Sequence, residues 1–193
     1  MKKFNQIRRC LTIIFIAGFL CINFSACQEK PEYYTAGDFE KAPKTDAHFH
    51  YNSTSMQYFE LASGFNFRLL SPNVDSRISI DKQLNTAAAL RQAYPGKFSF
   101  FGTFSVDSFA TKGFAENTIA RIEQCMKAGA SGIKIWKNIG MVLKDKDGRY
   151  VMADDPGFDP VFKYIVDNKI PVLGHLGEPK NCWLPFEEMT DTL

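Results

Sequence analysis

The sequence is poor in the residues and runs that mark several common protein classes. Only two of its five cysteines, Cys125 and Cys182, lie beyond residue 27, and one pair is not a disulfide framework. No stripe of basic residues follows the N-terminal region, which argues against nucleic acid as the main partner. After residue 21 no apolar run is long enough to cross a bilayer. Histidine is also rare, with three in 193 residues.

The one long hydrophobic run lies near the N-terminus and predicts an export signal. Basic residues precede the apolar run at 11–21, and small residues then lead to Cys27. The run is shorter than the ~20 residues of a spanning helix, so we expect a signal peptide over residues 1–26. The Ser-Ala-Cys sequence at its end resembles a bacterial lipobox, in which Cys27 is lipidated; simple secretion is the alternative. The expected location is a bacterial membrane, through a lipid anchor facing the periplasm or the cell exterior.

A polar segment over residues 27–43 has the composition of a tether, and the folded domain is expected over 44–193. Residues 1–26 carry four of the 23 Lys and Arg and none of the 21 Asp and Glu. Their removal changes the formal net charge from +2 to −2. The expected partner through the lipid anchor is a membrane, and the resemblance described below adds a small-molecule substrate.

Within 44–193, strand-like and helix-like segments alternate, which predicts an α/β fold built from βα repeats with parallel strands. The expected strands cover 44–50, 66–71, 97–106, 132–137 and 171–176, and the expected helices cover 54–63, 80–93, 114–128 and 158–168. A longer excursion at 138–157 contains Asp147-Gly148, which indicates a hairpin turn. We favour the hairpin over a calcium loop, because the full set of oxygen ligands is missing.

The three histidines all lie at the ends of expected strands. Asp46, His48 and His50 are spaced two residues apart on the first expected strand, so they share one face, while Phe49 faces the helices. His175 ends the fifth strand, and about 32 residues per repeat separate it from His48, the size of one βα unit. In a βα barrel the first and fifth strands face each other, and sites form at the carboxyl ends of strands. Imidazoles so placed are typical of a metal site.

The side chain of Lys134 is expected to point toward the inside of the barrel, because Ile133 and Ile135 lie on the opposite face of the fourth strand. A buried lysine is unfavourable without a partner. A carboxylate, a substrate anion, or reaction with carbon dioxide to a carbamate would each satisfy it. Asp46 is a candidate for a group that orients one of the histidines.

The segments Asp46–His50, Gly132–Trp136 and Pro171–Pro179 resemble strands one, four and five of the amidohydrolase-related metal-dependent hydrolases, in the branch that also contains decarboxylases. The resemblance implies an incomplete TIM-type (β/α)8 barrel and a hydrolase in which a metal-activated water attacks a C–N or C–O bond of a small molecule. It implies that His48, His50 and His175 ligate zinc, or manganese or iron. Lys134 matches the fourth-strand position that carries catalytic chemistry in part of the family.

The chain holds about five βα units where the family barrel has eight, so an eighth-strand aspartate and a sixth-strand histidine are not present. We expect the N-terminal portion of such an enzyme, inactive by itself; closure of a half-barrel as a homo-oligomer is the alternative. Decarboxylation is the second activity considered. The other two hypotheses are a non-catalytic metal- or solute-binding lipoprotein and a domain with inert core histidines. Asn73, Trp136 and Glu178 are candidate substrate contacts.

Overall fold

The computed structural model describes residues 34–53, 55–175 and 184–189. The expected signal peptide, Cys27 and Glu178 lie outside the described residues. Glu40–Leu193 forms one compact unit, separate from Met1–Phe39. No helix in the described part of the chain has the length and hydropathy of a membrane span.

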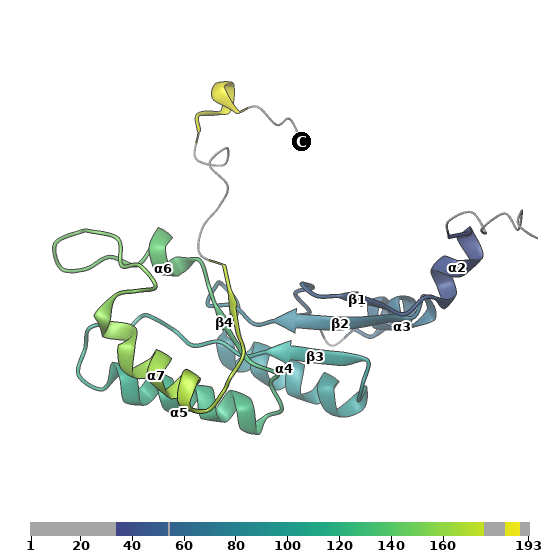
Figure 1. Cartoon of the computed structure of the whole chain (residues 1–193), viewed down its shortest axis with the longest axis horizontal. Helices are drawn as coiled ribbons and strands as arrows, with labels where there is room; N and C mark the ends of the chain where they lie inside the picture. Colours follow the sequence, from purple (N-terminus) through teal and green to yellow (C-terminus); the bar gives the residue numbers. More distant parts are fainter. Residues whose placement is uncertain (1–33, 54, 176–183, 190–193) are drawn as a thin grey trace, which may run out of the picture. The chain divides into compact units, whose positions relative to one another are not determined.

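Five short parallel strands form the centre of the larger unit (Figure 1). Pairing runs in chain order, with β1 beside β2, β2 beside β3, and β4 beside β5. A single parallel bridge between Gly102 and Ile133 connects the two groups of strands. The strands are β1 Lys44–Asp46, β2 Phe67–Pro72, β3 Phe98–Phe101, β4 Ile133–Ile135 and β5 Val172–Gly174.

Helices connect these strands, as the βα alternation predicts. They are α3 Gln57–Gly64, α4 Ile80–Ala93, α5 Phe114–Lys127 and α7 Asp159–Asp167, the last preceded by the 3-10 turn η1 Pro156–Phe158. Figure 1 shows α4, α5 and α7 along the same side of the strands. A short η3 turn covers Phe186–Glu188.

One face of the sheet packs against these helices and forms the core. Leu69, Phe98, Phe100 and Ile133, which share that face by register, are all buried. Gly102 belongs to the same face: a Cβ added there would lie 2.5 Å from the Cβ of Cys125 in α5. The sheet and α5 therefore meet at a position that only glycine can occupy.

The opposite face carries Ser99, Phe101 and Leu173, which are partly exposed. At the outer edge, Val172 of β5 is 44% exposed. The described residues thus form a mixed α/β structure with short parallel strands, which confirms the α/β part of the expected fold class. The incomplete TIM-type barrel stays a prediction.

Three local features depart from or refine the sequence expectations. Helix α2, Ala36–Lys41, lies within the expected tether, and the Asp38 carboxylate accepts hydrogen bonds from the backbone N–H and hydroxyl of Thr35. Helix α6, Asn138–Met141, opens the expected excursion and contains a kink. The hairpin in that excursion is confirmed by the antiparallel bridge between Lys144 and Tyr150.

Candidate metal site

The first strand slips by one residue just before its two histidines. Asp46 pairs with Leu69 on β2, but the next backbone bond runs from Phe49 N–H to the Leu70 carbonyl oxygen, at 3.1 Å. In a parallel ladder this bond places His48 beside Leu70. One extra residue, Ala47, is therefore accommodated on the first strand, which is the geometry of a β-bulge.

The slip changes the face on which Asp46 lies. Neighbouring residues of a strand point to opposite faces, so Asp46, beside Leu69, points to the helix side, whereas His48, beside Leu70, points to the open side. The expectation that Asp46 shares a face with the histidines is wrong for this reason. A carboxylate oxygen of Asp46 instead accepts a hydrogen bond from the backbone N–H of His48 at 3.1 Å. Asp46 therefore stabilises the bulge and does not orient an imidazole ring.

Three contacts hold the segment after the bulge along the end of β2. The first is the backbone bond of Phe49 described above. The second runs from Tyr51 N–H to the Ser71 hydroxyl oxygen at 2.9 Å, and the third joins His50 Nδ1 to the Pro72 carbonyl oxygen, also at 2.9 Å. The Phe49 ring stacks on Tyr58 of α3 at 4.3 Å, which confirms that it faces the helices.

The two imidazoles present adjacent nitrogens. A carbonyl oxygen only accepts, so the contact between His50 Nδ1 and the Pro72 carbonyl oxygen selects the His50 tautomer protonated on Nδ1, which has a lone pair on Nε2. His48 Nε2 lies 3.2 Å from His50 Nε2. Two nitrogens bound to one tetrahedral zinc at about 2.0–2.1 Å lie about 3.3 Å apart, so the pair fits a metal ion. The same spacing without metal is an N–H···N hydrogen bond.

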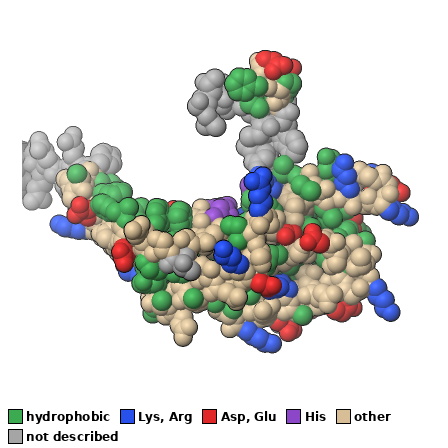
Figure 2. Space-filling view, turned by 180° about the vertical axis from the view of Figure 1, so that it is seen from behind, with side chains coloured by type: hydrophobic (Ala, Val, Ile, Leu, Met, Phe, Trp, Pro, Cys, Tyr) green, Lys and Arg blue, Asp and Glu red, His purple; other side chains and the backbone are tan. Residues whose placement is uncertain are grey.

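His175 lies beside the Trp136 ring. His175 N–H donates to the Ile135 carbonyl oxygen at 3.0 Å, which continues the β4–β5 register by one residue. The Trp136 ring contacts His175 at 5.2 Å and His50 at 6.2 Å between ring centroids, edge to face in both cases. Trp136, His50 and His175 therefore lie together on the open face, whereas Asp46 lies on the helix side and Glu178 lies outside the described residues. Figure 2 shows histidine side chains at the surface there.

Lys134 lies on the same face and is buried, as the sequence predicts. Its side chain is 1% exposed, and its Nζ has no hydrogen-bond partner among the described residues. Its removal from water lowers the pKa of the amine. The nearest aromatic group is Trp136, with the ring centroid 6.0 Å from Nζ. We call His48, His50, Lys134, Trp136 and His175 the open-face cluster.

The cluster does not by itself display a three-ligand metal centre. Among residues 34–53, 55–175 and 184–189, no three His, Cys, Asp or Glu side chains gather closely enough to hold one ion. The three-histidine ligand set stays a prediction. Asn73, a candidate substrate contact, is 1% exposed and its Nδ2 has no hydrogen-bond partner in the described part of the chain.

Asp75 is a residue that the sequence analysis did not single out, although it follows the second strand directly. Its carboxylate accepts hydrogen bonds from Asn138 Nδ2 at 2.7 Å, Val106 N–H at 3.3 Å and the Ser105 hydroxyl at 3.4 Å. Burial raises the pKa of this carboxyl group. Asp75 thus ties together the loops that follow three neighbouring strands at the edge where the cluster lies.

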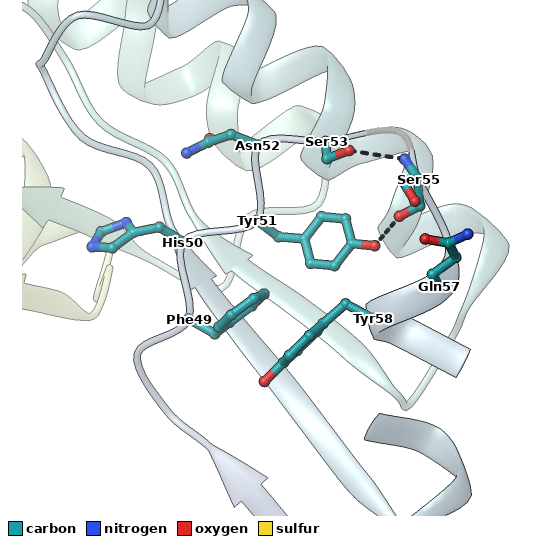
Figure 3. Close-up of a pocket in the computed structure, with 8 residues that line it drawn as sticks. All are labelled: Phe49, His50, Tyr51, Asn52, Ser53, Ser55, Gln57 and Tyr58. Carbon is teal, nitrogen blue, oxygen red and sulfur yellow. Dashed lines mark hydrogen bonds between the residues drawn. The ribbon is translucent and has the colours of Figure 1, made fainter. Parts of the chain in front are cut away.

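A cavity of about 250 Å³ adjoins the cluster and shares His50 with it. Its lining comes from one stretch of chain, and Figure 3 shows the Tyr51 hydroxyl donating to the Ser55 carbonyl oxygen across it. His50 points away from the Phe49 and Tyr58 rings in this view. The cavity is lined by Phe49, His50, Tyr51, Asn52, Ser53, Ser55, Gln57 and Tyr58.

The His48 imidazole is expected to titrate below the ordinary histidine pKa of about 6.5. Partial burial and then the nearby charge of Lys134 lower the pKa of this group. Its neutral form is favoured by folding, so stability falls as the pH drops below about 6.5 and no further below the folded-state pKa. NMR of the metal-free protein, with the same protein in concentrated urea as control, measures this. Lys134→Met should raise the pKa of His48 only in part, because the burial of His48 remains. An unchanged His48 pKa would contradict the proximity of Lys134 to His48.

Comparison of the chain with protein-family models, with curated proteins and with solved structures finds no match in any of the three.

Proposed function

We propose that this protein is a metal-dependent hydrolase of the amidohydrolase type. His48, His50 and His175 would hold a divalent ion, with zinc favoured over manganese or iron because imidazole nitrogens suit it. The observation that carries the proposal is the nitrogen pair 3.2 Å apart, together with the Pro72 carbonyl oxygen that holds the His50 proton on Nδ1. Metal-bound histidines commonly donate their second N–H to such an oxygen.

The protein's own residues would orient and enclose the reacting groups. A bound divalent ion in such a site supplies a water of lowered pKa and polarises a carbonyl group. The bulge before His48 and the Tyr51–Ser71 contact keep both imidazoles on the open face. The substrate would be a small molecule with a C–N or C–O bond, seated against Trp136, with Glu178 as a further contact.

A second function, metal binding without catalysis, is supported by one observation. The Asp46 carboxylate, whose charge acts on His48, accepts a hydrogen bond from the backbone N–H of His48 and does not contact an imidazole ring as a proton-transfer group would. A binding protein needs the ligands but no group that transfers a proton.

Metal loading followed by an activity assay tests the proposal. The protein, expressed from its complete reading frame, is stripped with a chelator and reloaded with zinc or manganese. Its hydrolysis of p-nitrophenyl acetate, a generic ester, is followed with the chelated protein as control. The proposed function expects one tightly bound ion and hydrolysis at least about tenfold above the chelated sample. Tight binding without turnover would establish the binding protein instead, and no binding would refute both.

A further inference from the structure

Lys134 is a buried cation without a counter-charge in the described structure. No Asp or Glu of residues 34–53, 55–175 and 184–189 forms an ion pair with it, and its Nζ lacks any hydrogen-bond partner there. Removal of an ammonium group from water is costly unless another charge or several acceptors replace the water. The position therefore lacks one interaction that the described residues do not provide.

The fixed geometry of β4 keeps this amine in place. Lys134 N–H donates to the Gly102 carbonyl oxygen at 2.6 Å, and the Thr103 hydroxyl donates to the Lys134 carbonyl oxygen at 2.9 Å. Both backbone groups are thus held by the two residues that directly follow β3, while Ile133 and Ile135 pack into the core on the opposite face. The side chain is directed to the open-face cluster by the strand and has no route to the helix side.

No described carboxylate balances the charge of Lys134. Asp46, on the helix side of the first strand, accepts the backbone N–H of His48 and does not pair with Lys134. Lys137, shortly after the end of β4, lies 5.2 Å from the Trp136 ring centroid. A ligand that reaches Lys134 therefore meets an unbalanced positive charge, and a bound divalent metal would add to it.

We propose that Lys134 is an anion-binding residue that pairs with a carboxylate group of the ligand. A single ammonium beside apolar and aromatic groups balances one negative charge. Phosphate is usually bound by several N–H donors or by forked guanidinium groups, which this position lacks among the described residues. Lys134 would be the ligand-binding part of the proposed metal site, so its biological role rests on the proposed function. The pairing of Lys134 with a carboxylate itself needs no metal.

Acetate binding to the metal-free protein tests this proposal. Trp183→Phe leaves Trp136 as the one tryptophan, so its fluorescence reports the cluster; chelator excludes binding through a metal. Acetate should change this signal saturably, and Lys134→Met should weaken binding at least about tenfold. Lys134→Arg, which keeps the charge, should retain part of it. Lys137→Met is the matched control and should change the affinity by less than about threefold. These magnitudes are those of one lost charge-assisted contact.

Several outcomes would overturn the proposal: acetate affinity unchanged in Lys134→Met, equal loss in Lys137→Met, or tighter binding of phosphate than of acetate. A covalent carbonyl signal on Lys134 from labelled bicarbonate would also overturn it, because the amine would then be a carbamate. Separate zinc and acetate titrations of the protein that retains Lys134 distinguish the two proposals. Zinc binding with no acetate binding refutes the anion site alone, whereas acetate binding with no zinc binding refutes the metal site alone.

Discussion

Substitution of Gly132 by alanine is expected to lower the free energy of unfolding by about 3 kcal/mol. An added Cβ would collide with the Pro171 carbonyl oxygen and would lie 2.5 Å from Cε1 of Phe101. The first of these is a backbone atom in the approach to β5, and it accepts the Ile133 N–H at 2.9 Å. The methyl group therefore cannot be accommodated by a side-chain rotation, and the β4–β5 pairing must shift.

Urea unfolding of the Gly132→Ala protein measures this effect, with Gly64→Ala as control. A Cβ at Gly64, the last residue of α3, would have no atom within 4 Å. Its replacement should change stability by less than about 0.5 kcal/mol, the usual range for a surface site. A Gly132→Ala protein as stable as the Gly64→Ala protein would show that the two strands do not approach so closely.

His50→Ala is expected to weaken zinc binding at least about 100-fold. Even loss of a group that only supports a metal ligand costs about 10–100-fold in affinity, and His50 would be a ligand itself. The substitution removes the nitrogen 3.2 Å from His48 Nε2. Competition with a chromophoric chelator measures the dissociation constant, and thermal unfolding without metal establishes that the variant is folded.

Three further variants sharpen the interpretation of that experiment. Gln57→Ala changes an exposed residue of the adjoining cavity and should leave zinc affinity unchanged. Ser71→Ala removes the acceptor of the Tyr51 N–H and should cost less than about tenfold, since it acts only through the position of the segment. His175→Ala should resemble His50→Ala if His175 is a third ligand. Undiminished zinc affinity in His50→Ala would remove the basis of the metal site.

The regular helices could be predicted well because their limits are encoded locally. The expected helix at 80–93 coincides with α4, which ends just before Pro95-Gly96, where Gly96 adopts a φ of +76°. The third strand was expected to continue to residue 106, but β3 ends at Phe101. Beyond the bridge at Gly102 the chain leaves the ladder, and Val106 N–H is bound by Asp75. That contact joins segments 31 residues apart, so a local pattern does not reveal it.

The site could be predicted in part, from repeat spacing and strand parity. Parity correctly assigned Lys134 to a buried position without a partner in the described chain. The same alternation predicted the wrong face for Asp46 relative to the histidines. It assumes a continuous ladder of paired residues, and the bulge at Ala47 interrupts that ladder. The contacts of Trp136 with two imidazoles depend on side-chain packing between strands, for which the sequence carries no periodic signal.

The bulge at Ala47 decides the direction of both imidazoles. In a regular ladder that kept Ala47, this alanine would lie beside Leu70, and His48 and His50 would point toward the helices. Deletion of Ala47 would place His48 directly after Asp46 and still beside Leu70, so both imidazoles would stay on the open face. In a comparison of sequences, a one-residue gap at this point would therefore be compatible with the same side-chain direction, whereas loss of the bulge with Ala47 retained would reverse it.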